Sequence, residues 1–175
     1  TDVAGDYSLV LAAGIYDVEY RKDGYIPLSL ADPIFVGVDP LVLDPVTLDP
    51  GVVIEVSGSI GTGRWETGTI ARIVGNANVA QYDTLWIEPG VRVLFSGEGY
   101  YEFAVYGTAF FLGAEGDSIV FESELPDAGP NAYNGVSFNG CAGGRVEYCV
   151  FRHGDSVQAG GWCFDPQRQL DFAHC

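Results

Sequence analysis

Acidic side chains are the most numerous groups in this chain that could do chemistry. Glycoside hydrolysis uses two carboxyl groups placed about 5–9 Å apart. Asp83 and Asp117 each precede a short apolar run, in D-T-L and D-S-I, which favours corner residues that accept hydrogen bonds from backbone amides. Alternation along the adjoining strands places Glu88 and Glu122 on a solvated outer face. The other acids of this region are Glu98, Glu102 and Glu147.

One histidine has acidic and hydroxyl neighbours, because His153 is followed by Asp155 and Ser156 in FRHGDS. A catalytic triad is defined by its arrangement in space and not by adjacency, so we interpret this stretch as a turn. The four cysteines lack the C-x-x-C spacing of a zinc ribbon. Two disulfides or a set of buried thiols would both fit them. The cysteines are Cys141, Cys149, Cys163 and Cys175.

Aromatic side chains are the remaining candidates for a binding site. Rings on a long strand surface can stack on sugars, although packing also explains many of them. Trp86 lies between the apolar residues Leu85 and Ile87 and should therefore point outward. We accordingly take Trp86, Tyr100 and Tyr101 as candidate ligand-stacking residues.

The charge of the chain limits its partners. It carries 24 acidic and 8 basic residues, a formal net charge of −16. This field repels phosphate backbones, so we predict no nucleic-acid partner. It also opposes a polyanionic sugar unless calcium ions bridge the two; we predict no cofactor, with calcium as the alternative. No apolar run approaches the roughly 18 residues of a membrane span.

The elements that must position these residues are short β-strands. Apolar residues make up 47% of the chain and charged residues 18%, which with 24 glycines is typical of a turn-rich β protein. The clearest pattern is DTLWIEPGVRVLF at 83–95, where apolar residues alternate on both sides of a Pro-Gly corner. We expect its buried residues to be Leu85, Ile87, Val91, Val93 and Phe95, and its outer residues to be Trp86, Glu88 and Arg92.

Later runs of the same kind recur at a loose spacing. We expect inward pairs at Phe103/Val105, Ile119/Phe121, Val136/Phe138 and Tyr148/Val150. Short strands at such a period are typical of a solenoid, in which stacked turns share one core. The glycine-rich stretch at 58–63 lacks the Lys-Ser/Thr of a phosphate-binding loop, so we interpret it as a flexible loop.

The first 50 residues differ from the rest. Alternating runs at 7–11, 16–20 and 26–30 predict three antiparallel strands joined by tight turns, and the Asp-Pro-rich stretch at 33–51 predicts a closing strand and an extended connector. The segments TDVAGDYSL, AGIYDVEY and DGY resemble the second half of a carboxypeptidase regulatory-like domain. The resemblance implies a partial β-sandwich over 1–50, an accessory module without catalytic residues.

Residues 78–155 resemble the start of a right-handed parallel β-helix of secreted bacterial proteins, the pectin-lyase-like superfamily. The matching pieces are DTLWIEPGVRVLF, FAVYGTAFFLGAEGDSIVFES, NGVSF and GGRVEYCVFRHG. The chain departs from the family pattern at Tyr82 and Asn134, both at expected corners. The resemblance implies an all-β chain with N-terminal rungs of a right-handed parallel β-helix over 51–175, preceded by the partial antiparallel β-sandwich.

Several functions are carried by this solenoid, so the resemblance implies no single reaction. Lyases of this kind need a basic side chain beside calcium-holding carboxylates, but Arg92, Arg145 and Arg152 have no such cluster near them in the sequence. We therefore expect a non-catalytic scaffold or adhesion segment, secreted or on the cell surface, with a polysaccharide or cell-surface glycan as its partner. The alternatives are the start of a polysaccharide lyase or glycoside hydrolase with later catalytic rungs, and a subunit that self-associates edge to edge. With no Met and with open rungs, the chain is expected to be a fragment.

Overall fold

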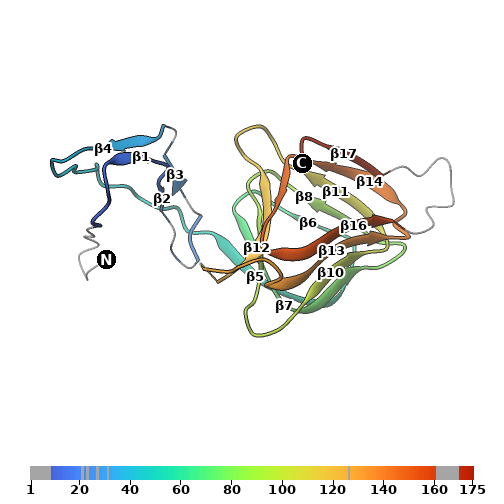
Figure 1. The fold of residues 1–175 in the computed structure, drawn as a ribbon. Coiled ribbons are helices and arrows are strands. Elements are labelled where there is room, and N and C mark those ends of the chain that lie inside the picture. Colours follow the sequence, from blue (N-terminus) through green and yellow to red (C-terminus); the bar gives the residue numbers. More distant parts are fainter. Residues whose placement is uncertain are drawn as a thin grey trace. The chain divides into compact units, whose positions relative to one another are not determined.

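The computed structural model describes residues 9–20, 22, 24–26, 28–30, 32–125, 127–160 and 170–175 (Figure 1). Every regular element among these residues is a β-strand. This described part contains no helix with the length and apolar character needed to cross a bilayer. The chain divides into two compact units, Thr1–Pro50 and Gly51–Cys175.

The described part of the first unit holds four very short strands. β1 (Gly14–Tyr16) pairs antiparallel with β4 (Ile34–Val36), and β2 (Glu19–Tyr20) pairs antiparallel with β3 (Leu28–Ser29). The antiparallel pairing was expected, but the strand expected at 7–11 is wrong for its described part, since residues 9–11 form no strand. Leu9 and Val10 are exposed, and no described residue before Val56 belongs to the buried core. Without an apolar layer to cover it, this run gains nothing from pairing.

The second unit holds thirteen strands in its described part. They are β5 (Val52–Ile60), β6 (Gly63–Trp65), β7 (Thr69–Val79), β8 (Thr84–Ile87), β9 (Arg92–Phe95), β10 (Glu102–Val105), β11 (Thr108–Leu112), β12 (Ile119–Ser123), β13 (Tyr133–Asn139), β14 (Gly143–Glu147), β15 (Cys149–Phe151), β16 (Gly154–Gly160) and β17 (Leu170–Ala173).

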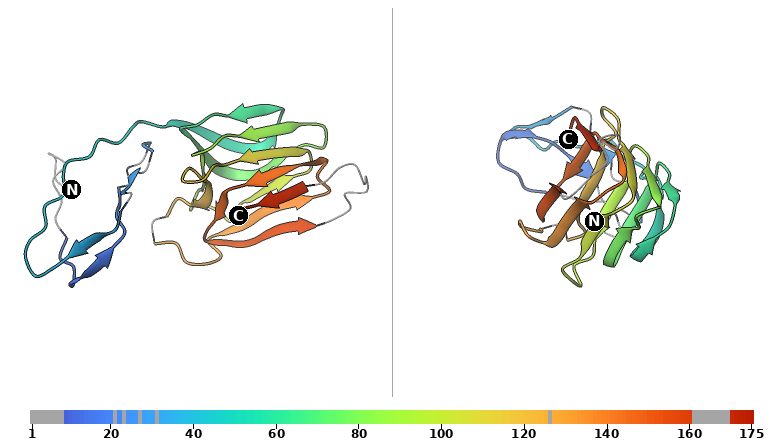
Figure 2. Two further views of the ribbon diagram at one scale, coloured as in Figure 1. Left: turned by 90° about the horizontal axis from the view of Figure 1, so that it is seen from above. Right: turned by 90° about the vertical axis from the view of Figure 1, so that its right-hand side faces the viewer.

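The strands of the second unit pair in parallel and form two sheets. One sheet has the order β6-β8-β11-β14-β17. The other has the order β15-β12-β9-β7-β10-β13-β16, with β5 also paired to β7. Strands far apart in the sequence thus lie side by side (Figure 2). The all-β, parallel arrangement is consistent with a β-helix-like fold, the coarser part of the expectation.

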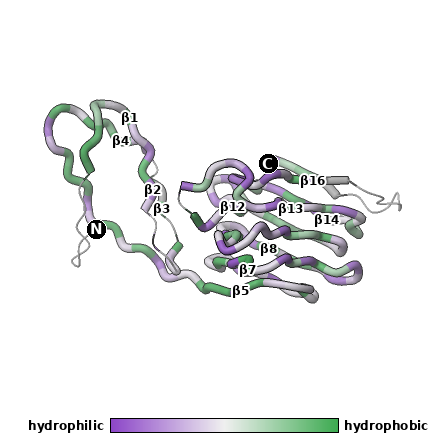
Figure 3. Tube along the Cα trace, turned by 60° about the horizontal axis from the view of Figure 1, so that its bottom comes forward, coloured by the Kyte–Doolittle hydropathy of each residue, from purple (hydrophilic) through white to green (hydrophobic). Residues whose placement is uncertain are grey.

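The core lies between these sheets, and alternate residues of β8 and β9 are buried in it. Figure 3 shows the hydropathy of each residue along the same chain trace. The expectation for 83–95 is confirmed for the inward residues, each of which is at most 1% exposed: Leu85, Ile87, Val91, Val93 and Phe95. Phe111 contacts Phe103, Phe121 and Phe138 with ring centroids 6.2, 5.7 and 5.8 Å apart. Rings from four different strands therefore share one buried layer.

Two local expectations are wrong. The pair Tyr148/Val150 was expected to point inward, but Tyr148 has φ 45°, outside the strand, and this resets the alternation by one residue. Cys149 is buried instead, and Phe151 stacks on Phe121 at 4.9 Å. The glycine stretch is also not a simple loop, because β5 runs through Gly58, whose φ of 71° coincides with a shift in the register between β5 and β7.

Candidate ligand-binding face

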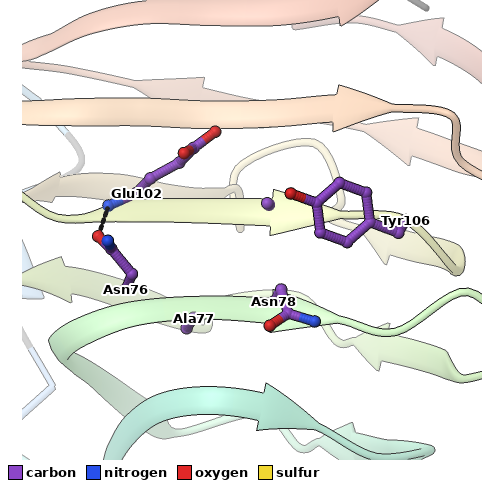
Figure 4. A pocket seen from close by; sticks show the side chains of 6 residues that line it. Asn76, Ala77, Asn78, Glu102 and Tyr106 are labelled. Carbon is purple, nitrogen blue, oxygen red and sulfur yellow. Dashed lines mark hydrogen bonds between the residues drawn. The ribbon is translucent and has the colours of Figure 1, made fainter.

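A shallow hollow of about 190 Å³ lies on the outer face of β7 and β10 (Figure 4). Asn76 and Asn78 line it from β7, and Glu102 and Ala104 line it from β10. Tyr106, one residue past the end of β10, closes one side with a ring that is 44% exposed. The hollow therefore presents two amides, a carboxylate and an aromatic ring to solvent.

Hydrogen bonds fix the polar groups of this hollow. Asn76 Oδ1 accepts from the Glu102 backbone N–H at 3.0 Å, which links β7 to β10. Ser137, on β13, donates its hydroxyl to Glu102 Oε1 at 2.5 Å. These contacts hold the carboxylate and one amide in place before any ligand arrives, which lowers the ordering cost of binding.

Parallel register aligns the residues of the hollow with residues on the neighbouring strands. Asn78 lies opposite Ala104, Ala104 opposite Ser137, and Ser137 opposite Gln158 on β16. In-register neighbours on parallel strands point to the same side of the sheet. Gln158 Nε2 also donates to the Ser156 hydroxyl at 3.0 Å. The row that crosses β7, β10, β13 and β16 thus holds three polar residues, Asn78, Ser137 and Gln158, with Ala104 between the first two and with Ser137 buried.

Trp86, the first candidate for ligand stacking, lies on the other sheet. It is on the outer side of β8 as expected, in register with Arg64 on β6 and Phe110 on β11. The Phe110 ring stacks on it with centroids 5.8 Å apart and planes at 17°, and Arg64 Cζ lies 5.8 Å from its centroid. Because neighbours lie against the indole on two sides, Trp86 presents its edge more than its face.

Tyr100 and Tyr101 have different surroundings despite being adjacent. Tyr100 is 53% exposed in the turn before β10. Tyr101 packs against the core, and its backbone carbonyl accepts from Asn134 at 3.0 Å. Tyr100 thus keeps a solvent-facing ring, whereas Tyr101 is a packing residue.

The acids fall into distinct environments. Asp83 Oδ1 accepts from the backbone N–H and the hydroxyl of Thr62, each at 2.9 Å, which confirms the corner-capping role expected for Asp83. Arg64 donates to Glu88 at 2.8 Å, and this hydrogen bond, with a second from Thr67, lowers the pKa of Glu88. Asp83, Glu88 and Arg64 do not line the hollow.

The expectation that Glu122 is solvated is wrong. Its side chain is 1% exposed and is ion-paired with Arg92, which is itself 11% exposed rather than on the solvent side. Arg152 approaches its other oxygen at 3.8 Å. Since β12 lies between β9 and β15, each carboxylate on its outer side meets side chains from the strands on both sides. The arrangement is an ion-paired cluster, not the exposed row that a single strand predicts.

A second ion pair lies nearby on the same sheet. Arg72 donates to both oxygens of Glu124, at 2.6 and 3.0 Å, and Gly97 N–H donates to Glu124 Oε1 at 3.0 Å. The hydrogen bond from Arg72 lowers the pKa of Glu124, against the opposing effect of burial. Residues 72 and 124 are far apart in the sequence, so the ion pair forms only when the strands of this sheet are paired.

The histidine and cysteine candidates do not converge on the hollow. His153 adopts φ 65° at a turn, consistent with the turn interpretation, and its carbonyl accepts from Ala132 at 2.7 Å. Cys141 and Cys149 are buried and Cys175 is exposed, and both Cys149 and Cys175 are thiols. Cys163 lies outside the described residues. Within the described ranges, no three His, Cys, Asp or Glu side chains come together in a way that could hold a metal ion.

Sequence reasoning pointed to Glu102, one of several acids, but not to the hollow itself. Asn76, Asn78 and Ser137 gave no signal of their own. Asn76 and Asn78 do alternate in N-A-N, with Ala77 buried between them, which marks a polar outer face. What joins them to Glu102 and Ser137 is the pairing between strands.

Comparison with known proteins adds no relative to this description. No protein-family model, no curated protein and no solved structure matches the chain.

Proposed function

We propose that residues 51–175 are rungs of a right-handed parallel β-helix of the pectin-lyase-like kind, which serve as a secreted or cell-surface scaffold and bind a glycan without catalysis. The parallel pairing of successive strands and the alternation of buried residues support the fold. The hollow formed by Asn76, Asn78, Glu102 and Tyr106 carries the functional part of the proposal.

The groups around the hollow suit sugar hydroxyls. Amides donate and accept hydrogen bonds, and a carboxylate accepts from two hydroxyls at once. The Tyr106 ring adds an apolar surface for the C–H face of a pyranose. Because residues of successive strands line up, an elongated chain of sugars that lies across the strands would meet Asn78 on β7 and Gln158 on β16 as well as the hollow.

The charge of the site favours a neutral glycan. Glu102 is the one ionisable acid among the six lining residues, and no basic residue lines the hollow to receive a uronate. The net charge of −16 works in the same direction. Since hydrolysis of a glycoside uses two carboxyl groups, the described lining supports binding rather than cleavage.

A glycan array with matched variants tests this function. Tyr106→Ala and Glu102→Gln should each weaken binding of a neutral polysaccharide by roughly tenfold, about 1.4 kcal/mol, the scale of one stacked ring or one charge-assisted hydrogen bond. Tyr82→Ala is the control, since Tyr82 is 93% exposed and does not line the hollow. It should bind as the parent chain does.

Trp86→Ala distinguishes the two sheets. We expect it to retain binding, because the indole is packed between Arg64 and Phe110. Loss of binding in Trp86→Ala together with full binding in Tyr106→Ala would move the site to the sheet of β8 and overturn the hollow as the binding site. If the parent chain binds no glycan on the array, the binding function itself is refuted.

A further inference from the structure

Two cysteines stand at equivalent positions on neighbouring parallel strands. β14 and β17 pair in register, with Glu147 opposite Ala173. The register continues beyond both strands, since Tyr148 N–H donates to the Ala173 carbonyl at 3.1 Å. The rings of Tyr148 and His174 then stack, with centroids 4.6 Å apart and planes at 11°. The following residue on each segment is a cysteine.

The two thiols of this next pair, Cys149 and Cys175, are close to one another. Cys149 Sγ lies 3.4 Å from the carbonyl oxygen of Glu147. Cys175 Sγ lies 3.5 Å from the carbonyl oxygen of Val146, the residue before Glu147 on β14. The nearby Cys175 side chain contributes to the raised pKa of the Cys149 thiol, which places the two side chains within interaction range of one another. Paired strands lie about 4.8 Å apart, within the Cα separation of roughly 4.4–6.8 Å that a disulfide spans.

We propose that Cys149 and Cys175 form a disulfide bond, made by exchange with a small-molecule disulfide such as oxidised glutathione. The thiolate of exposed Cys175 attacks one glutathione sulfur, forms a mixed disulfide and releases one glutathione thiolate. Cys149 then loses its proton to solvent and attacks the Cys175 sulfur, which releases the second glutathione thiolate. Two protein thiols are oxidised and one external disulfide is reduced to two thiols.

The two cysteines have different environments, and this sets the order of the steps. Cys175 is exposed, so it meets the external disulfide first. Cys149 is 1% exposed, and burial raises the pKa of its thiol, with a smaller contribution from Cys175. The second step should therefore speed up as the pH rises.

The bond would secure the outermost strand of one sheet. β17 stands at the end of the order β6-β8-β11-β14-β17 and pairs with β14 alone among the described strands. A strand at a sheet edge opens more readily than an inner strand. A disulfide bond between Cys149 and Cys175 would link the end of β17 covalently to the strands that precede it.

Tryptic mapping without reductant reads the linkage directly. Cleavage after Arg145, Arg152 and Arg168 places each cysteine in its own peptide, with Cys149 in residues 146–152 and Cys175 in 169–175. In a glutathione redox buffer, we expect the peptide 146–152 linked to 169–175 to be the main product that contains Cys149. It should form faster at pH 8.5 than at pH 7 and disappear on reduction.

Variants separate the proposed pair from other pairings. Cys175→Ser alters an exposed position, so the fold should persist while the linked peptide is lost and Cys149 remains a thiol. Cys163→Ser should leave the linked peptide unchanged. Reductant should lower the thermal midpoint of the parent chain but not that of Cys175→Ser. Linkage of 146–152 to either of the other two cysteine peptides, or no linkage at any glutathione ratio, would overturn the proposal.

Discussion

Phe111 and Phe110 are adjacent on β11 and provide a sharp test of the core. Phe111 is fully buried and contacts rings from β10, β12 and β13, whereas Phe110 is half-buried on the outer side against Trp86. Phe111→Ala should cost about 3–5 kcal/mol, because it removes the buried ring and leaves a cavity between three strands. Phe110→Ala should cost about 1 kcal/mol, the scale of one stacked pair at the surface.

Urea unfolding followed by circular dichroism measures both costs on the same strand with the same substitution. The midpoint should fall far more for Phe111→Ala, while the dependence on denaturant should stay similar in both variants if each remains two-state. Phe110→Ala thus controls for the loss of an aromatic ring and for strand propensity. Equal costs, or a larger cost for Phe110→Ala, would show that the inward phase assigned to β11 is wrong.

Two further predictions concern packing and pH. Gly144→Ala should destabilise the chain by more than about 2 kcal/mol, because Gly144 has φ 138° and a methyl group there would collide with the Ala109 carbonyl; Gly61→Ala, in open space, should be nearly neutral when unfolded in parallel. The pKa of Glu124 is lowered in the folded state, so its pairing with Arg72 stabilises the fold above about pH 4.5 and is lost as the pH falls through the lower folded-state pKa. Arg72→Met should therefore be less stable than the parent chain at pH 7, with a gap that shrinks toward pH 3 in urea unfolding, and a gap that grows on acidification would contradict this.

Much of the local structure could be predicted from the sequence, because strand alternation is a local property. Leu85, Ile87 and Val93 were placed correctly since each strand exposes alternate residues to the core, whatever its partners are. The prediction failed at Tyr148, where a left-handed backbone conformation shifted the phase by one residue. Nothing in the residue type marks such a shift in advance.

The candidate site could be predicted only in part, for a physical reason. A carboxylate on the outer side of an isolated strand is solvated, but Glu122 has Arg92 on β9 and Arg152 just after β15 beside it. Glu102 likewise becomes part of a site through Asn76 and Ser137, which pairing brings to it. These contacts depend on the register between strands, which the single-strand pattern does not contain.

By itself, the sequence determined the all-β class, the inward residues of the clearest strands and the corner role of Asp83, since each depends on short-range periodicity or turn chemistry. Only the tertiary structure decided which outward residues become neighbours. Parallel pairing placed Asn78, Ser137 and Gln158 in one row with Ala104 and packed Trp86 between two side chains. The parallel pairing of strands sets those contacts, because it joins residues that are distant along the chain.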